Sequence, residues 1–313
     1  MTGVLLFFLY SCNKENENFK EQNLEQNQEV IQSSNQVETR SDESVLTSIS
    51  LNNGILEFTD FTHFRNAVDY LEAENEKHVD NFLSTYSDLD DDELFDKEQE
   101  LSFSDYVPSE NFESSKGFSS RRAYVETAIQ GWLNNEVLDD TNDPDDWDDL
   151  DEEMRTFFNQ DGNIKIGGEI YHMDDFSGVE SIFADGCKRH KVKKYTKYYG
   201  ANNNKRFKVR VAATSGPLRL IIKTKVVSQK KKWFGWGRYR TNVYASVGGA
   251  VSDQNCIGGI GVSAFKGPKK RRRIKAKYVD WDPEVWHKFQ PGAISGTGWA
   301  GSSNEQIGLV LNW

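Results

Sequence analysis

The two halves of this 313-residue chain carry opposite charges, and this split limits the fold more than any other feature of the sequence. Residues 1–185 contain 11 basic and 44 acidic side chains, whereas residues 186–313 contain 27 basic and 5 acidic ones. The halves therefore carry net charges of −33 and +22. Two arrangements fit this distribution: the halves face each other, or each is solvated separately and faces its own partner.

Helical patterns dominate the acidic half. Thr59 or Asp60 is a suitable N-cap for a helix in which apolar residues recur three and four positions apart over residues 61–71. Ser119 or Ser120 is a similar cap for a second amphipathic helix, and a third helix is expected over residues 150–159. The acidic residues 88–93 are interpreted as a connection. These patterns predict helices packed on an apolar core.

Two short β motifs flank these helices. Asn53-Gly54-x-Leu56-x-Phe58 combines a turn with an alternating run, and Asp161-Gly162-x-Ile164-x-Ile166-Gly167-x-x-Ile170-Tyr171 predicts a hairpin with a Gly167-Gly168 turn. In their spacing these motifs resemble paired motifs of uncharacterised bacteroidete lipoproteins. The resemblance covers roughly residues 50–175, and the family implies no activity or catalytic residues for this chain.

The basic half has the pattern of a β domain. Phe207, Val209 and Val211 alternate with Arg206, Lys208 and Arg210, which predicts a strand with one apolar and one basic face. Further strands are expected at residues 218–227, 239–247, 257–265, 274–279 and 307–311. We therefore predict an α+β fold, with an acidic helix-rich region at 45–186 and an antiparallel, sandwich-like or barrel-like all-β domain at 187–313.

The first residues have the features of an export signal. Residues 1–11 are uncharged and mainly apolar, and are shorter than the about 20 residues that span a membrane. Leu9-Tyr10-Ser11-Cys12 resembles a bacterial lipobox, so we expect cleavage before Cys12 and acylation of its thiol. Residues 12–44 are rich in Asn, Gln, Glu and Ser, which predicts a disordered tether.

A short charged motif follows the expected anchor. Lys14-Glu15-Asn16-Glu17 resembles the lysine-plus-acidic tags of bacteroidete lipoproteins that are exported to the cell surface. This resemblance implies a protein that is lipid-anchored in the outer membrane and surface-exposed. The alternative is an ordinary solvated linker, because charge is common in tethers.

Residues with metal or redox chemistry are few. With Cys12 acylated, Cys187 and Cys256 remain, and both a disulfide between them and two buried thiols fit this number. The carboxylates of residues 139–153 do not match the ligand spacing of an EF-hand. We therefore expect no metal site and no cofactor.

One segment between two expected strands combines aromatic rings with cations. It predicts a hairpin whose candidate binding residues are Lys230, Lys231, Lys232, Trp233, Phe234, Trp236, Arg238 and Arg240. Aromatic faces stack on sugars, and cations attract sulfates or uronates. The alternative is that Trp233 and Trp236 fold back on the sheet as a lid. A second cationic run, residues 269–273, fits either a binding surface or a charged edge strand.

These features favour a membrane-anchored lipoprotein of unknown activity whose β domain binds a glycan or a protein, or self-associates. An anionic polysaccharide is the expected class of glycan, and nucleic acid is not expected as a partner. One alternative is a hydrolase on a β scaffold, although no nucleophile with an adjacent base is present. The other is a structural module of the cell envelope in which the acidic half docks on the basic half.

The expected anchor can be tested by metabolic labelling. Wild-type protein should incorporate radiolabelled palmitate, and Cys12→Ala should abolish the label because the acylated thiol is lost. Globomycin should cause the unprocessed precursor to accumulate. A wild-type protein without label would contradict the expectation.

Overall fold

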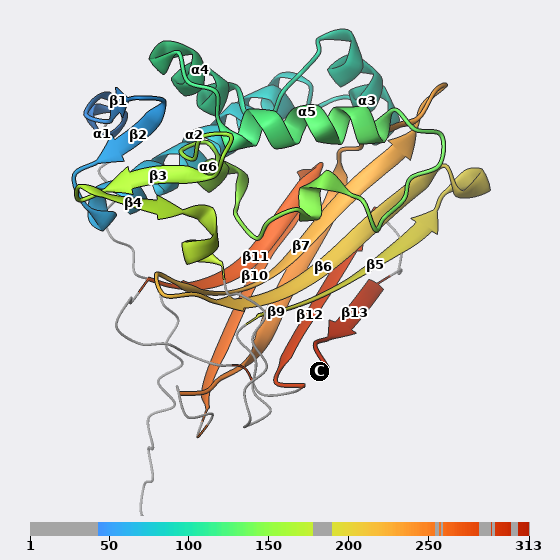
Figure 1. Ribbon diagram of the computed structural model, residues 1–313. Coiled ribbons are helices and arrows are strands. Elements are labelled where there is room, and N and C mark those ends of the chain that lie inside the picture. Colours follow the sequence, from blue (N-terminus) through green and yellow to red (C-terminus); the bar gives the residue numbers. More distant parts are fainter. Residues whose placement is uncertain are drawn as a thin grey trace, which may run out of the picture. The chain divides into compact units, whose positions relative to one another are not determined.

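Helices fill the acidic half of the chain and mainly antiparallel strands fill the basic half, which confirms the expected α+β fold (Figure 1). The computed structural model describes residues 43–177, 190–253, 257, 259–281, 289, 292–301 and 306–312. These residues belong to one compact unit, Arg40–Trp313.

The acidic half combines a small sheet with several helices. Its sheet has the order β1-β2-β3-β4, with β1 at Ser50–Asn52, β2 at Ile55–Phe58, β3 at Asn163–Ile166 and β4 at Glu169–His172. The α-helices are α1 (Ser44–Thr47), α2 (Phe61–Thr85), α3 (Asp91–Glu100), α4 (Val107–Lys116), α5 (Arg121–Leu133) and α6 (Glu152–Arg155). Two 3₁₀ turns, η1 (Pro144–Asp146) and η2 (Met173–Phe176), complete this half.

The capping signals of the sequence place the starts of the helices. Asp60 accepts a hydrogen bond from the His63 amide at 2.8 Å and begins α2, and Ser120 accepts one from the Ala123 amide at 3.0 Å and begins α5. The interpretation of residues 88–93 as a connection is wrong in part. Asp90 and Glu93 form a capping box, so this acidic run begins α3.

The helix expected over residues 150–159 is much shorter than predicted. Only α6 is helical there, because Asp151 is still extended and Asn159 pairs with Ser120 in an isolated β-bridge. Phe157 and Phe158 follow the helix and are fully buried in the core of the acidic half. The apolar residues that suggested a longer helix therefore belong to this core.

The predicted hairpin of the acidic half is confirmed. Strands β3 and β4 pair antiparallel, and Gly167 and Gly168 both have positive φ angles in the turn. Strand β2 pairs in parallel with β3, and Phe58 lies opposite Ile166. The two sequence motifs therefore lie side by side in one sheet.

The basic half is a sandwich of two sheets that do not close into a barrel (Figure 1). One sheet has the order β11-β7-β6-β5, with β8 paired to β7: β5 is His190–Tyr199, β6 Lys205–Ser215, β7 Leu220–Lys231, β8 Trp236–Arg238 and β11 Arg273–Asp280. The other has the order β10-β9-β12-β13: β9 is Thr241–Val251, β10 Ile260–Arg271, β12 Ile294–Ala300 and β13 Gln306–Val310. The 3₁₀ turn η3 (Ala201–Asn203) links β5 to β6.

The two sheets pack through alternating apolar side chains. Val209 and Val211 of β6 are fully buried in this core, as the alternation of the sequence predicts. Glycine in β12 allows the sheets to approach closely, because a Cβ on Gly298 would contact Val209 and Val226 of the facing sheet. The basic side chains of β6 must then point away from the sandwich core, toward the helical half.

Candidate functional site

The sheet β11-β7-β6-β5 carries a grid of cations on the side away from the sandwich core. Arg210 lies opposite Lys225, which in turn lies opposite Lys275 on the next strand. This cationic grid consists of Lys208, Arg210, Lys223, Lys225, Arg273, Lys275 and Lys277. Like charges opposite one another destabilise a sheet, so the grid requires anions.

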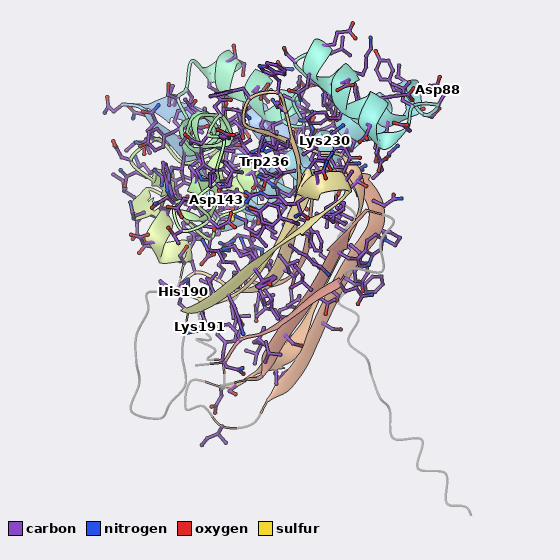
Figure 2. The ribbon with its side chains drawn as sticks, turned by 90° about the vertical axis from the view of Figure 1, so that its right-hand side faces the viewer. Asp88, Asp143, His190, Lys191, Lys230 and Trp236 are labelled. Carbon is purple, nitrogen blue, oxygen red and sulfur yellow. The ribbon has the colours of Figure 1, made fainter. Side chains whose placement is uncertain are left out.

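Carboxylates of residues 143–153 lie directly on this grid. Asp145 Oδ2 is 2.7 Å from Lys225 Nζ, and Glu152 Oε2 is 2.9 Å from Lys275 Nζ. Figure 2 shows Asp143, which pairs with Lys208, where the helical half meets the sheet. We call these contacts the ion-pair layer. They select the first arrangement that the charge split allowed, in which the two halves face each other.

The ion-pair layer is charged at neutral pH. Burial alone would raise the pKa of Asp145 and Glu152, but Arg273 and the neighbouring lysines hold the pKa of both carboxyls well below its ordinary value. Burial also lowers the pKa of Lys225 to about 8, so this amine is still mainly protonated at pH 7. Buried charges of both signs therefore depend on each other for neutralisation.

A histidine lies at the edge of the same layer. The Asp149 carboxylate accepts hydrogen bonds from Arg210 at 2.5 Å and Thr214 at 3.1 Å, and its other contact is His190 Nε2 at 2.9 Å. Asp149, His190 and Arg210 line a pocket of about 490 Å³ whose wall includes Trp147. Sequence reasoning missed this pair because Asp149 and His190 are far apart in the chain and match no motif.

Two carboxyls of this pocket, those of Asp149 and Asp146, are poor proton donors. Burial would raise the pKa of Asp149, but Arg210 and His190 hold it well below the ordinary value. The pKa of Asp146, which Lys208 and Arg210 contact, is also lowered despite burial. A general acid needs a pKa close to the working pH. Neither carboxyl therefore suits the acid role that the hydrolase alternative requires.

The segment of candidate binding residues forms the expected hairpin between β7 and β8. Trp233 is fully exposed at the tip, and Phe234 beside it is 67% exposed. Gly235 has a positive φ, and a Cβ there would contact the backbone of Leu133 at 2.5 Å. Only glycine lets the hairpin approach the end of α5 this closely, so the tip has a fixed position.

Trp236 has a different environment from Trp233, although only two residues separate them. Its ring is buried, and its Nε1 donates to the Glu136 carbonyl at 3.2 Å. The Arg206 guanidinium lies 5.3 Å from the ring centroids of both Trp236 and Trp132. Trp236 thus packs against the helical half (Figure 2), while Trp233 does not fold back.

Most cations of the hairpin also bind residues of the helical half. The contacts are Lys230 with Asp92, Lys232 with Gln99, Arg238 with Glu126 and Arg240 with Glu98. Within the described part of the chain, Lys231 has no such side-chain partner. The structure therefore brings Lys231, Trp233 and Phe234 together as the exposed group, and separates Trp236, Arg238 and Arg240 from it.

A polar groove of about 350 Å³ runs beside the hairpin. Its lining includes Lys232 and Arg238 together with Glu126 and Gln130 of α5. Burial and nearby Arg272 lower the pKa of Lys232. Because Arg238 binds the Glu126 carboxylate through two hydrogen bonds of 3.0 and 2.7 Å, its charge is already neutralised.

The second cationic run belongs to the contact between the halves. Its ion pairs are Lys269 with Glu76, Lys270 with Asp91, Arg271 with Asp80, Arg272 with Glu98 and Arg273 with Asp145. Residues 269–273 therefore form ion pairs with carboxylates of the helical half.

Three further features considered from the sequence are the cysteines, a metal site and a membrane-spanning helix. Cys12, Cys187 and Cys256 lie outside the described residues. Among the residues that are described, no group of His, Cys, Asp and Glu has the arrangement of a metal site. In the same part of the chain, no helix is both long and apolar enough to cross a membrane.

The fold and the site define an α+β protein in which ion pairs join a helical half to an open β-sandwich. No family model and no curated protein matches the chain. A solved structure, that of a DUF4848 family protein from Bacteroides thetaiotaomicron, is similar at 14% identity and a TM-score of 0.23. The match covers 85% of this chain and 100% of the other. A similarity this weak supports no inference about a ligand or an activity.

The ion-pair layer predicts a large difference between two Asp→Asn substitutions. Asp145→Asn removes a buried anion from beside Lys225, Arg155 and Arg273, and should lower the free energy of unfolding by about 3–5 kcal/mol. Asp80 also binds an arginine but is 60% exposed, so Asp80→Asn should cost less than about 1 kcal/mol. Urea denaturation measures both values. Equal losses would contradict a structural role for the layer.

Proposed function

We propose that this protein is a lipid-anchored protein of the cell envelope that binds an anionic polysaccharide through the hairpin tip, Lys231, Trp233 and Phe234. The observation that carries the proposal is the exposure of two neighbouring large aromatic side chains beside a lysine that has no side-chain partner among the described residues. Elsewhere in this hairpin the rings of Trp236 and Tyr239 are buried, and the cations have side-chain partners in the helical half. Packing within the fold therefore does not account for the exposed aromatic rings of the tip, and such exposure is typical of an interaction site.

The chemistry of the tip suits an acidic sugar polymer. The face of an indole or phenyl ring packs on the apolar C–H face of a sugar ring, and the Lys231 ammonium attracts a carboxylate or sulfate of the same chain. The fixed position of the tip reduces the entropy that binding must overcome. A single lysine gives modest affinity, so several repeats of the polymer would be bound by neighbouring protein molecules on one surface.

The anchor and the tether complete the proposal. Acylation of Cys12 would hold the chain on the membrane, and residues 12–44 would let the sandwich reach a polymer at some distance from it. Display on the outer face of the outer membrane rests on the motif at Lys14–Glu17.

A second candidate function is a structural module of the envelope. The ion-pair layer favours it, because this layer joins the two halves through many buried charge pairs that no ligand needs to complete. In that case the exposed hairpin tip forms an apolar contact with another envelope component and binds no ligand.

The hairpin proposal can be tested by binding to heparin and polygalacturonate. Trp233→Ala/Phe234→Ala should weaken binding by about 5- to 150-fold, since the loss of two ring contacts is worth about 1–3 kcal/mol. Lys231→Gln should weaken binding less and should reduce its dependence on salt concentration. Isothermal titration calorimetry at several salt concentrations measures both effects.

Ile170→Ala is the matched control. Ile170 is 63% exposed on β4, so its truncation removes a comparable apolar side chain without touching the hairpin. It should leave binding unchanged. If the double variant binds as tightly as the wild type, the hairpin tip is not the site.

A further inference from the structure

The sheet β10-β9-β12-β13 has an outer face that is unlike the rest of the molecule. Away from the end where Lys270 lies opposite Asn242, the side chains that point away from the sandwich core come from alternate positions between residues 244 and 250, 261 and 265, 295 and 299, and 306 and 310. None of these positions holds Asp, Glu, Lys, Arg or His, although 28% of the chain is charged. We call this surface the uncharged face.

An aromatic row crosses the uncharged face. Tyr244 lies opposite Trp299 on the neighbouring strand, and their rings are nearly parallel, with centroids 6.0 Å apart and planes at 15°. Phe265, which is 77% exposed, lies opposite Ser246 and therefore diagonally beside Tyr244. The row spans three adjacent strands, or about 10 Å.

Hydroxyl groups lie next to this row. Thr297 is opposite Ser246, and Ser263 and Ser295 are opposite Gly248, so all four share the outer face. In the described part of the chain, none of these four hydroxyls has a hydrogen-bond partner. They can therefore donate and accept hydrogen bonds with a ligand.

We infer that the uncharged face binds a neutral polysaccharide. Sugar rings are apolar on their C–H faces and carry hydroxyls at their edges, and the face offers aromatic rings beside free hydroxyls. A charged polymer or an acidic or basic protein surface would find no opposite charge there. This site shares no residue with the hairpin tip, so each proposal stands if the other fails.

A second copy of the chain fits the face less well. The area shared by the four strands measures about 20 Å by 15 Å, roughly 300 Å², from a rise of ~3.3 Å per residue and a strand spacing of ~4.8 Å. A stable protein interface buries about 800 Å² on each partner. A narrow row of rings with adjacent hydroxyls instead matches the width of a single polymer chain.

Affinity electrophoresis with soluble β-glucan, xylan, galactomannan and glycogen tests the inference. At least one polymer should retard the wild-type protein, and Trp299→Ala should reduce this retardation about tenfold, whereas Trp299→Phe should retain most of it. Phe265→Ser alters only an exposed ring, so it should weaken binding without loss of folding. Thr297→Val should weaken binding severalfold because it removes one hydroxyl and keeps the shape.

The controls separate this site from the hairpin tip. Trp233→Ala and Ile170→Ala should bind the neutral polymer as the wild type does, and thermal unfolding verifies that each variant is folded. The inference is overturned if none of the four polymers retards the wild type, or if Phe265→Ser and a folded Trp299→Ala variant both bind normally. It is also overturned if sedimentation shows a wild-type dimer that Phe265→Ser dissociates.

Discussion

Charge neutralisation between residues 143–153 and the cationic grid determines how the helical half sits on the sandwich. Strands β6, β7 and β11 place their lysines and arginines in register, so without anions the sheet would hold buried like charges side by side. Asp145 and Glu152 supply those anions at the centre, and Arg271 and Arg240 reach the helices at the edges. Once this layer is formed, the outer face of the other sheet and the hairpin tip remain exposed.

The sequence predicted the elements better than it predicted their contacts. The alternation from Arg206 to Val211 is a local property of a strand, so it identified both faces of β6 correctly. The pairing of Asp145 with Lys225 depends on the path of a loop over the sheet, and no local pattern encodes that path. The sequence therefore showed that the halves could face each other, but not which charges meet.

In the hairpin, too, the sequence did not predict the tertiary contacts, even for two residues that are close together in the chain. Trp233 and Trp236 have equal aromatic character in the sequence, but tertiary contacts with Glu136 and Arg206 bury Trp236 and leave Trp233 exposed. The uncharged face was likewise missed, because its rings and hydroxyls lie on separate strands that are brought together by register. Both proposed sites are therefore products of the fold, and the ion-pair layer leaves them accessible.

The pH dependence of the free energy of unfolding tests the central role of the ion-pair layer most directly. Asp145, Asp149, Asp151 and Glu152 have folded-state pKa values well below their ordinary ones, so unfolding takes up protons once the pH falls to about 4. The free energy of unfolding should have its full value above about pH 5. As the pH is lowered below 4, it should decrease by about 1.4 kcal/mol per pH unit for each such carboxyl. A free energy of unfolding that is constant between pH 5 and pH 3 would contradict this account.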